Sequence, residues 1–161
     1  FEAGLVDGSQ RDGSNSSTTV HESAVIREPV VIAPDCEIGA GAVVGPYVCL
    51  GENTTVGSNA VVEQSVIDAD TRIGAGATVV DCVTGVGVTI GNGTTIPGGP
   101  GDVRVGNRVF EDEDLGALLA DRVEDQGGCA YVPGAIVGSD TVVEAGTTVR
   151  GTLSEGMEVR S

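Results

Sequence analysis

Lysine and tryptophan are absent from this chain of 161 residues, and the other aromatic residues are scarce. All eight basic residues are arginine, against 24 Asp and Glu, so the formal net charge at pH 7 is -16. A negative charge of this size repels phosphate backbones, which argues against nucleic acid as a partner. No apolar run reaches the length of about 18 residues that a membrane-spanning helix needs, so we expect no membrane partner.

The missing lysine needs a cause, because lysine is normally among the commonest residues. We predict a cytoplasmic protein of a halophilic organism. In molar salt the Debye length falls to about 3 Å, so repulsion between carboxylates is screened, and arginine is less strongly hydrated than lysine and more versatile in pairing. Chance acidity in a mesophilic protein is the alternative, and it explains the charge but not the missing lysine. We see no signal peptide at the start of the sequence.

Aliphatic residues recur at every sixth position over much of the chain. Glycine follows many of them, as at Gly39 and Gly51, and the fifth position of the unit is usually small, as at Ala42 and Thr54. The first series is unbroken and comprises Val20, Ile26, Ile32, Ile38, Val44, Leu50, Val56 and Val62. After shifts of one residue the step continues at Ile67, Ile73, Val79, Ile90 and Ile96, and it returns at Tyr131, Val137, Val143 and Val149.

A six-residue period cannot keep these side chains on one face of a helix. Short strands can, if the chain turns a corner after each unit and points one large aliphatic side chain inward from each flat side. Glycine at the second position favours a bend with positive φ. Three sides close a coil of about 18 residues, and coils stack as parallel strands about 4.8 Å apart. We therefore predict an all-β solenoid over residues 20–161, with an interior too narrow for aromatic side chains.

Units such as Ile38-Gly39-Ala40-Gly41-Ala42-Val43 resemble the hexapeptide-repeat family over about residues 20–153. This resemblance implies a left-handed parallel β-helix; the hand comes from the family, because parallel crossovers are normally right-handed. Within the family, the chain resembles the C-terminal half of archaeal sugar-1-phosphate nucleotidylyltransferases, which include glucose-1-phosphate thymidylyltransferase-like proteins and bifunctional uridylyl/acetyltransferases. The matching stretches are Ile32–Gly57, Leu115–Leu119 and Val132-Pro133-Gly134.

Residues 1–19 are predicted to be a linker and the remnant of an upstream domain. Residues 7–19 are rich in Ser, Asp, Gly and Asn, and a chain that begins with Phe1 suggests a fragment of a longer protein. The resemblance places nucleotidyl transfer in that upstream domain, which would bind the nucleotide, Mg²⁺ and a sugar phosphate. Residues 1–19 offer neither a Gly-rich phosphate loop nor a carboxylate pair for Mg²⁺. We therefore expect the fragment alone to be inactive in nucleotidyl transfer.

Residues 97–114 interrupt the repeat with a turn-rich start, Pro97–Gly101, and a run of four acids, Glu111–Asp114. We expect an inserted loop that protrudes from the solenoid; a solvated insertion is the simpler interpretation, and a flap over a cleft between subunits is the alternative. Residues 115–126 combine helical spacing of leucines with the six-residue step. We predict strands there, because the repeat resumes in phase after them.

The candidate catalytic residue is His21, the only histidine. Hexapeptide-repeat acetyltransferases typically use a histidine as general base for attack on acetyl-CoA, although a single histidine near the start of the repeat is also typical of a plain surface residue. One histidine cannot supply the three zinc ligands of the hexapeptide-fold carbonic anhydrases, and we predict no metal site. The resemblance places acyl-CoA, if it binds, in a groove near Gly116 and Ala117.

Phosphate-binding candidates are Arg104 and Arg108 in the insertion, with Arg72 as a further one; each is also a natural partner for a surface carboxylate. The four cysteines have no metal-ligand spacing, and we expect Cys36, Cys49, Cys82 and Cys129 to be small buried side chains.

These observations favour a C-terminal β-helix domain of a nucleotidylyltransferase, which assembles as a homotrimer and positions or regulates the catalytic domain. An acetyl-CoA-dependent acyltransferase acting on an amino-sugar phosphate is the first alternative. A stand-alone structural solenoid is the second.

Overall fold

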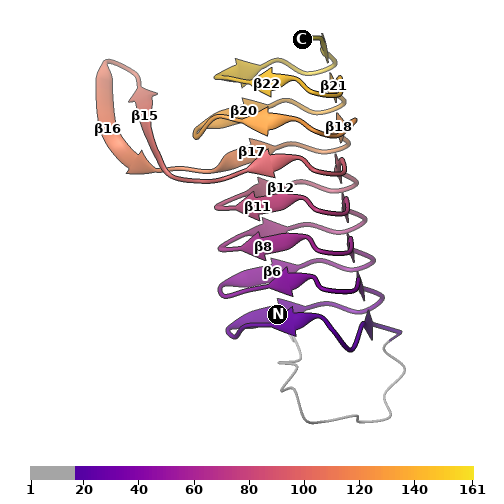
Figure 1. Cartoon of the computed structure of the whole chain (residues 1–161). Helices are drawn as coiled ribbons and strands as arrows, with labels where there is room; N and C mark the ends of the chain where they lie inside the picture. The colour runs from indigo at the N-terminus through magenta and orange to yellow at the C-terminus, as the bar shows by residue number, and fades with distance from the viewer. Residues whose placement is uncertain (1–16) are drawn as a thin grey trace.

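The computed structural model describes residues 17–161, and of residues 103–105 only the backbone. This part of the chain forms 24 short strands and contains no helix. All but two of the strands wind into a three-sided solenoid of parallel strands (Figure 1). The predicted all-β solenoid is confirmed, and the structure agrees with the left-handed β-helix that the family resemblance implies. Nor do the described residues contain a helix that is long and apolar enough to cross a membrane.

Each side of the solenoid is one parallel sheet. The first sheet contains β1 (Thr19–Val20), β4 (Glu37–Ile38), β7 (Thr55–Val56), β10 (Arg72–Ile73), β13 (Thr89–Ile90), β18 (Glu124–Asp125), β21 (Val142–Val143) and β24 (Glu158–Val159). The second sheet contains β2 (Val25–Ile26), β5 (Val43–Val44), β8 (Val61–Glu63), β11 (Thr78–Val80), β14 (Thr95–Ile96), β19 (Ala130–Tyr131) and β22 (Thr148–Val149). The third sheet contains β3 (Val30–Ile32), β6 (Val48–Leu50), β9 (Val66–Ile67), β12 (Val83–Thr84), β17 (Ala117–Leu119), β20 (Ala135–Val137) and β23 (Thr152–Leu153).

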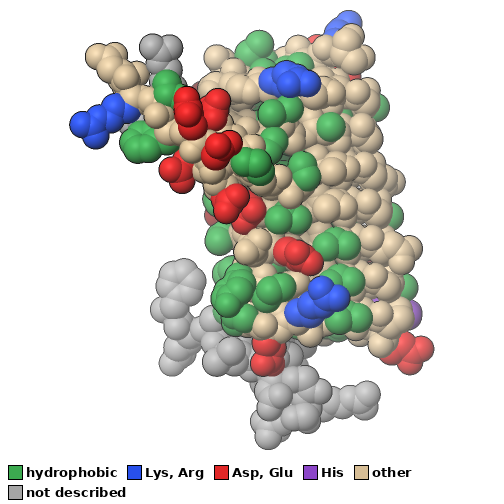
Figure 2. Space-filling model, turned by 60° about the vertical axis from the view of Figure 1, so that its left-hand side comes forward, with side chains coloured by type: hydrophobic (Ala, Val, Ile, Leu, Met, Phe, Trp, Pro, Cys, Tyr) green, Lys and Arg blue, Asp and Glu red, His purple; other side chains and the backbone are tan. Residues whose placement is uncertain are grey.

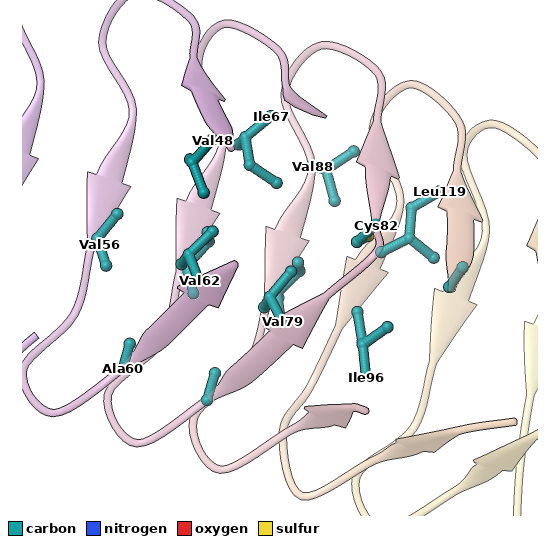
Figure 3. Packing of buried hydrophobic residues seen from close by; sticks show 14 of the residues in the cluster. Val48, Val56, Ala60, Val62, Ile67, Val79, Cys82, Val88, Ile96 and Leu119 are labelled. Carbon is teal, nitrogen blue, oxygen red and sulfur yellow. The ribbon is translucent and has the colours of Figure 1, made fainter. Parts of the chain in front are cut away.

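The interior holds the aliphatic residues of the six-residue series. Val44, Val62 and Val79 are fully buried on successive coils of the second sheet. The small residues of the fifth position, such as Ala60, are also buried in the interior, where Figure 3 shows Ala60 with Val62 and Val79. Each coil thus buries its apolar side chains against the coils on either side of it, as in other solenoids.

The glycines at the second position of the unit serve a different purpose from the one expected. A side chain at Gly57 would lie 2.5 Å from the backbone nitrogen of Ala75, so these glycines allow successive coils to stack closely. Positive φ falls instead at the fourth position, for example 56° at Asn53 and 58° at Asp70. The predicted role in bending is therefore wrong for most of the series, although Gly45 does have a φ of 101°.

The insertion is more regular than the loop expected over residues 97–114. It forms an antiparallel hairpin of β15 (Pro100–Val105) and β16 (Arg108–Asp114), which leaves the solenoid between β14 and β17 and projects from its side (Figure 1). Gly106 and Asn107 form the two-residue turn, and Gly106 has the positive φ, 61°, that such turns favour. At residues 115–126, β17 and β18 confirm the prediction of strands.

Candidate functional site

The structure keeps the candidate catalytic and acyl-CoA-binding residues apart. His21 follows β1 in the first coil, and Gly116 precedes β17 in the fifth, which separates them by about 19 Å along the solenoid axis. The Nδ1 atom of His21 lies 2.8 Å from the hydroxyl oxygen of Ser23, and this oxygen accepts a hydrogen bond from the Gly41 amide at 3.0 Å. These contacts orient the imidazole on an exposed corner.

Gly116 and Ala117 are small because other parts of this chain pack closely against them. A side chain at Gly116 would overlap the carbonyl oxygen of Asp81 on the preceding coil, and the Gly116 carbonyl accepts a hydrogen bond of 2.7 Å from the Gly134 amide. Ala117 is buried in the interior. Coil stacking therefore explains why the residues here are small, and acyl-CoA binding near them stays a prediction.

Two of the candidate phosphate-binding arginines belong to the hairpin, and the third belongs to the first sheet. Arg108 is exposed at the start of β16, and Arg104 belongs to β15, where its side chain lies outside the described residues. Arg72 lies on the outer face of the first sheet and donates a hydrogen bond of 3.0 Å to the hydroxyl of Thr55, not to a carboxylate.

Three of the four cysteines are buried, as expected, and Cys49 is the exception because it faces outward from the middle of β6. None of these cysteines forms a disulfide. Burial raises the pKa of Cys36 and Cys129, and it raises the pKa of Cys82 to about 12. These three thiols therefore stay protonated and unreactive near neutral pH.

A buried polar cluster occupies the interior where the chain rejoins the solenoid after the hairpin. Asp125 takes an inward position of the six-residue series and is only 1% exposed. Its carboxylate accepts hydrogen bonds of 2.9 and 3.1 Å from the Thr94 hydroxyl and of 2.7 Å from the Gly127 amide. The Thr94 oxygen in turn accepts a bond of 3.3 Å from the Cys129 amide. The cluster thus joins the coil before the hairpin to the coil after it.

Tyr131 is the next inward residue of the same coil, and only 2% of it is exposed. The expectation that aromatic side chains are excluded is therefore wrong here. Among residues 17–161 the Tyr131 hydroxyl has no hydrogen-bond partner. Burial, reinforced by Asp125, raises the pKa of Tyr131 above its ordinary range.

This cluster is sealed from solvent, so its groups cannot reach a substrate. In the part of the chain that the structure describes, no three His, Cys, Asp or Glu residues are grouped so that they could hold a metal ion. Side chains that could contact a ligand or partner lie on the hairpin and on the outer faces of the three sheets. Acidic side chains gather on the hairpin (Figure 2).

On the outer face of the third sheet, apolar side chains are aligned across six consecutive strands. We call this row the apolar stripe; it comprises Val31, Cys49, Val66, Val83, Leu118 and Ile136. The six-residue repeat did not predict the stripe, although its members are the apolar residues next to the buried ones in the repeat. The six-residue step identified the inward side chains and gave no separate pattern for those that face outward.

Stacked six-residue units on three parallel sheets define a hexapeptide-repeat β-helix. Residues 26–153 match the family of the GMPPB C-terminal domain, and the chain belongs to this family. No curated protein sequence matches the chain.

Solved structures share the fold at low sequence identity. The acetyltransferase domain of PglB from Neisseria gonorrhoeae, in complex with acetyl coenzyme A, is 18% identical with a TM-score of 0.58, and the match covers 89% of this chain and 54% of that one. A UDP-N-acetylglucosamine acyltransferase from Francisella novicida is 18% identical with a TM-score of 0.57, over 81% of this chain and 55% of that one. This chain therefore spans about half the length of both.

A variant of the N-acyltransferase AntD from Bacillus cereus, in complex with dTDP-4-amino-4,6-dideoxyglucose and coenzyme A, is 16% identical. Its TM-score is 0.60, and the match covers 85% of this chain and 81% of that one.

Proposed function

We propose that this β-helix is the C-terminal assembly domain of a sugar-1-phosphate nucleotidylyltransferase of the glucose-1-phosphate thymidylyltransferase-like kind. The observation that carries the proposal is the family match, which spans nearly the whole solenoid, from residue 26 to residue 153. Nucleotidyl transfer belongs to a catalytic domain upstream of Phe1, which binds the nucleotide, Mg²⁺ and the sugar phosphate. The β-helix joins copies into a homotrimer and holds the catalytic domains in place, in the cytoplasm of a halophile.

The rigidity of the solenoid supports this role. Its coils are linked by parallel strand pairing over their whole length, and its interior is closely packed, so it is suited to holding attached domains at set positions. Sedimentation equilibrium of the isolated β-helix tests the trimer, and a monomer at every concentration would contradict it.

The experiment that tests the enzyme uses the native gene and its full reading frame. We expect that frame to continue upstream into a Gly-rich phosphate loop, and the full chain to release pyrophosphate from a nucleoside triphosphate and a sugar 1-phosphate at high salt. The β-helix alone should release none. A full chain that carries no such loop, or that shows no transfer with any of a panel of sugar phosphates and nucleotides, would overturn the proposal.

The second candidate is an acyltransferase that transfers an acetyl group from acetyl-CoA to an amino-sugar phosphate. It is favoured by the likeness in fold to the PglB and AntD structures, whose complexes contain acetyl coenzyme A and coenzyme A. Calorimetry with acetyl-CoA at high salt separates the two candidates. Micromolar binding would favour the acyltransferase, and no binding favours the assembly domain. A native frame without any upstream domain would instead favour a stand-alone solenoid.

A further inference from the structure

The apolar stripe exposes large side chains that a monomer would leave in water. Val66, Val83, Leu118 and Ile136 are 52, 47, 44 and 45% exposed. Strand pairing places them in one register, with Val83 opposite both Val66 and Leu118. Together with Val31 and Cys49 they form an unbroken row about 24 Å long. A contiguous apolar surface of this kind marks a contact site.

The stripe is also free of charge on a molecule with a net charge of -16. None of the outward positions along the third sheet, from Val31 to Thr152, carries a charged side chain. The corresponding row on the first sheet includes Glu37, Arg72, Glu124 and Glu158. Two copies of this acidic chain repel each other wherever their carboxylates come close together. The outer face of the third sheet carries no carboxylate in its strands, so two copies can pack there without that repulsion.

The spacing of the stripe identifies its occupant. Side chains at successive strands stand about 4.8 Å apart. A second solenoid presents its outward side chains with the same period, so an apolar row on it can match the stripe along its whole length. A partner recognised by charge would bind elsewhere, because none of the outward positions of the paired strands in the third sheet is charged.

We propose that the apolar stripe of the third sheet is the surface through which this chain packs against a second copy of itself. The inference deepens the assembly role proposed above and rests on it. It identifies the contact face and leaves the first sheet exposed to solvent in the assembly.

The test compares two double variants of the isolated β-helix, since the paired strands of the described residues run from residue 19 to residue 159. Val83→Arg with Leu118→Arg places charges in the stripe. Thr89→Arg with Val142→Arg is the matched control, because it places the same charges on the outer face of the first sheet. Both variants add two positive charges, so a change in overall repulsion cannot distinguish them. Arg72 already occupies an outward position, which shows that the solenoid accommodates arginine there.

Sedimentation equilibrium at high salt measures the outcome. We expect the stripe variant to associate at least about 100-fold more weakly than the wild type, and the control to associate like the wild type. Circular dichroism and the unfolding temperature show whether both variants are folded. If the arginine stripe variant does not fold, Val83→Thr with Leu118→Thr replaces it, since threonine occupies many outward positions of this solenoid.

The possible results separate the inference from the proposed function. A wild type that is monomeric at all concentrations would overturn both the assembly role and the stripe. An oligomeric wild type whose folded stripe variant still associates normally would overturn only the stripe. If the control variant loses association and the stripe variant keeps it, the contact face is the first sheet and the proposal for the stripe is wrong.

Discussion

Asp125 shows how a single residue can break the repeat without breaking the fold. Burying a carboxylate is unfavourable unless its oxygens are hydrogen-bonded. Thr94 and the Gly127 amide supply those bonds, from one coil below and from two residues further along the chain. The polar exception in the six-residue series is therefore a buried contact that ties two coils together.

We predict strong coupling between these two side chains. Thr94→Val leaves the buried Asp125 carboxylate without this hydrogen bond and should cost about 2–4 kcal/mol in the free energy of unfolding, whereas Asp125→Val leaves only neutral groups without their partner and should cost about 1–3 kcal/mol. The double variant should cost less than the sum of the two, because it removes both polar groups together. Urea denaturation of the four proteins measures this. Additive losses would show that the hydrogen bond contributes nothing.

Buried thiol and phenol groups predict a loss of stability at alkaline pH. Burial raises the pKa of Cys82 from 9.0 to about 12, and burial with nearby Asp125 raises that of Tyr131 above 10.0. The folded chain holds these protons more tightly than the unfolded chain does. The stability is therefore complete below about pH 9 and falls as the pH rises, by about 1.4 kcal/mol per pH unit for each group.

Urea denaturation between about pH 8 and pH 11 measures this slope. Cys82→Ala is the informative variant, because Ala117 occupies the equivalent place in the next coil and alanine fits there. The variant should lose the share of the slope near pH 9 that Cys82 contributes, and keep the shares of Cys36, Cys129 and Tyr131. Identical slopes in the two proteins would contradict the assignment to Cys82.

At the scale of elements, the hairpin projects from the solenoid and buries little of itself. Every residue of β16 is exposed. The two ends of the hairpin meet at its base, where the Leu115 amide donates a hydrogen bond of 2.8 Å to the Gly99 carbonyl. The coil can therefore close without the hairpin.

We predict that replacing residues 100–114 by a two-residue Asn-Gly turn leaves the solenoid folded. The free energy of unfolding should change by less than about 1 kcal/mol, because few buried contacts are lost. Thermal and urea denaturation, with circular dichroism as a check on the strands, measure the change. Unfolding of the shortened chain would show that the hairpin covers part of the interior.

The base of the hairpin should tolerate much less change than its strands. Gly116→Ala should cost at least about 3 kcal/mol, because its methyl group would overlap the Asp81 carbonyl oxygen on the preceding coil. Gly101→Ala is the control, because its methyl group would lie 3.1 Å from the Pro133 carbonyl oxygen and needs only a small shift. Equal stability of the two variants in urea would contradict the close stacking at Gly116.

At the scale of the whole molecule, charge is poorly balanced. The ion pairs that the described residues form are few and exposed; the best aligned joins Arg122 to Asp140 at 2.7 Å. Such surface pairs contribute little, so they cannot offset the repulsion of a chain with net charge -16. Screening by salt is therefore the main way in which this repulsion is reduced.

We predict that salt stabilises the protein. Between about 0.1 M and about 1 M ionic strength the Debye length falls from about 10 Å to about 3 Å. The unfolding temperature should rise by at least about 5 °C over this range, which corresponds to about 1–2 kcal/mol. Differential scanning calorimetry in two chlorides with different cations measures it, since screening depends on ionic strength and not on the cation. A flat response would contradict the halophilic interpretation.

Much of the fold could be predicted because the repeat is local. Each six-residue unit contains one inward aliphatic residue and one small residue at its fifth position. Each unit therefore indicates one flat side of the solenoid and the corner next to it. The hairpin could also have been found, since Gly106-Asn107 stands between residues of high strand propensity and is a known two-residue turn. The polar cluster could not, because Thr94 and Asp125 lie 31 residues apart with the hairpin between them.

The sequence by itself determined the solenoid, because its period dictates which side chains face inward on every coil. Only the tertiary structure decided which residues of neighbouring coils meet. Stacking gave Gly57 and Gly116 their close backbone contacts, enclosed Asp125 with Thr94, and aligned Val66, Val83, Leu118 and Ile136 into one exposed row. Each of these contacts joins residues of different coils. Which residues meet depends on the length of each coil and on the strand register, and both vary along this chain.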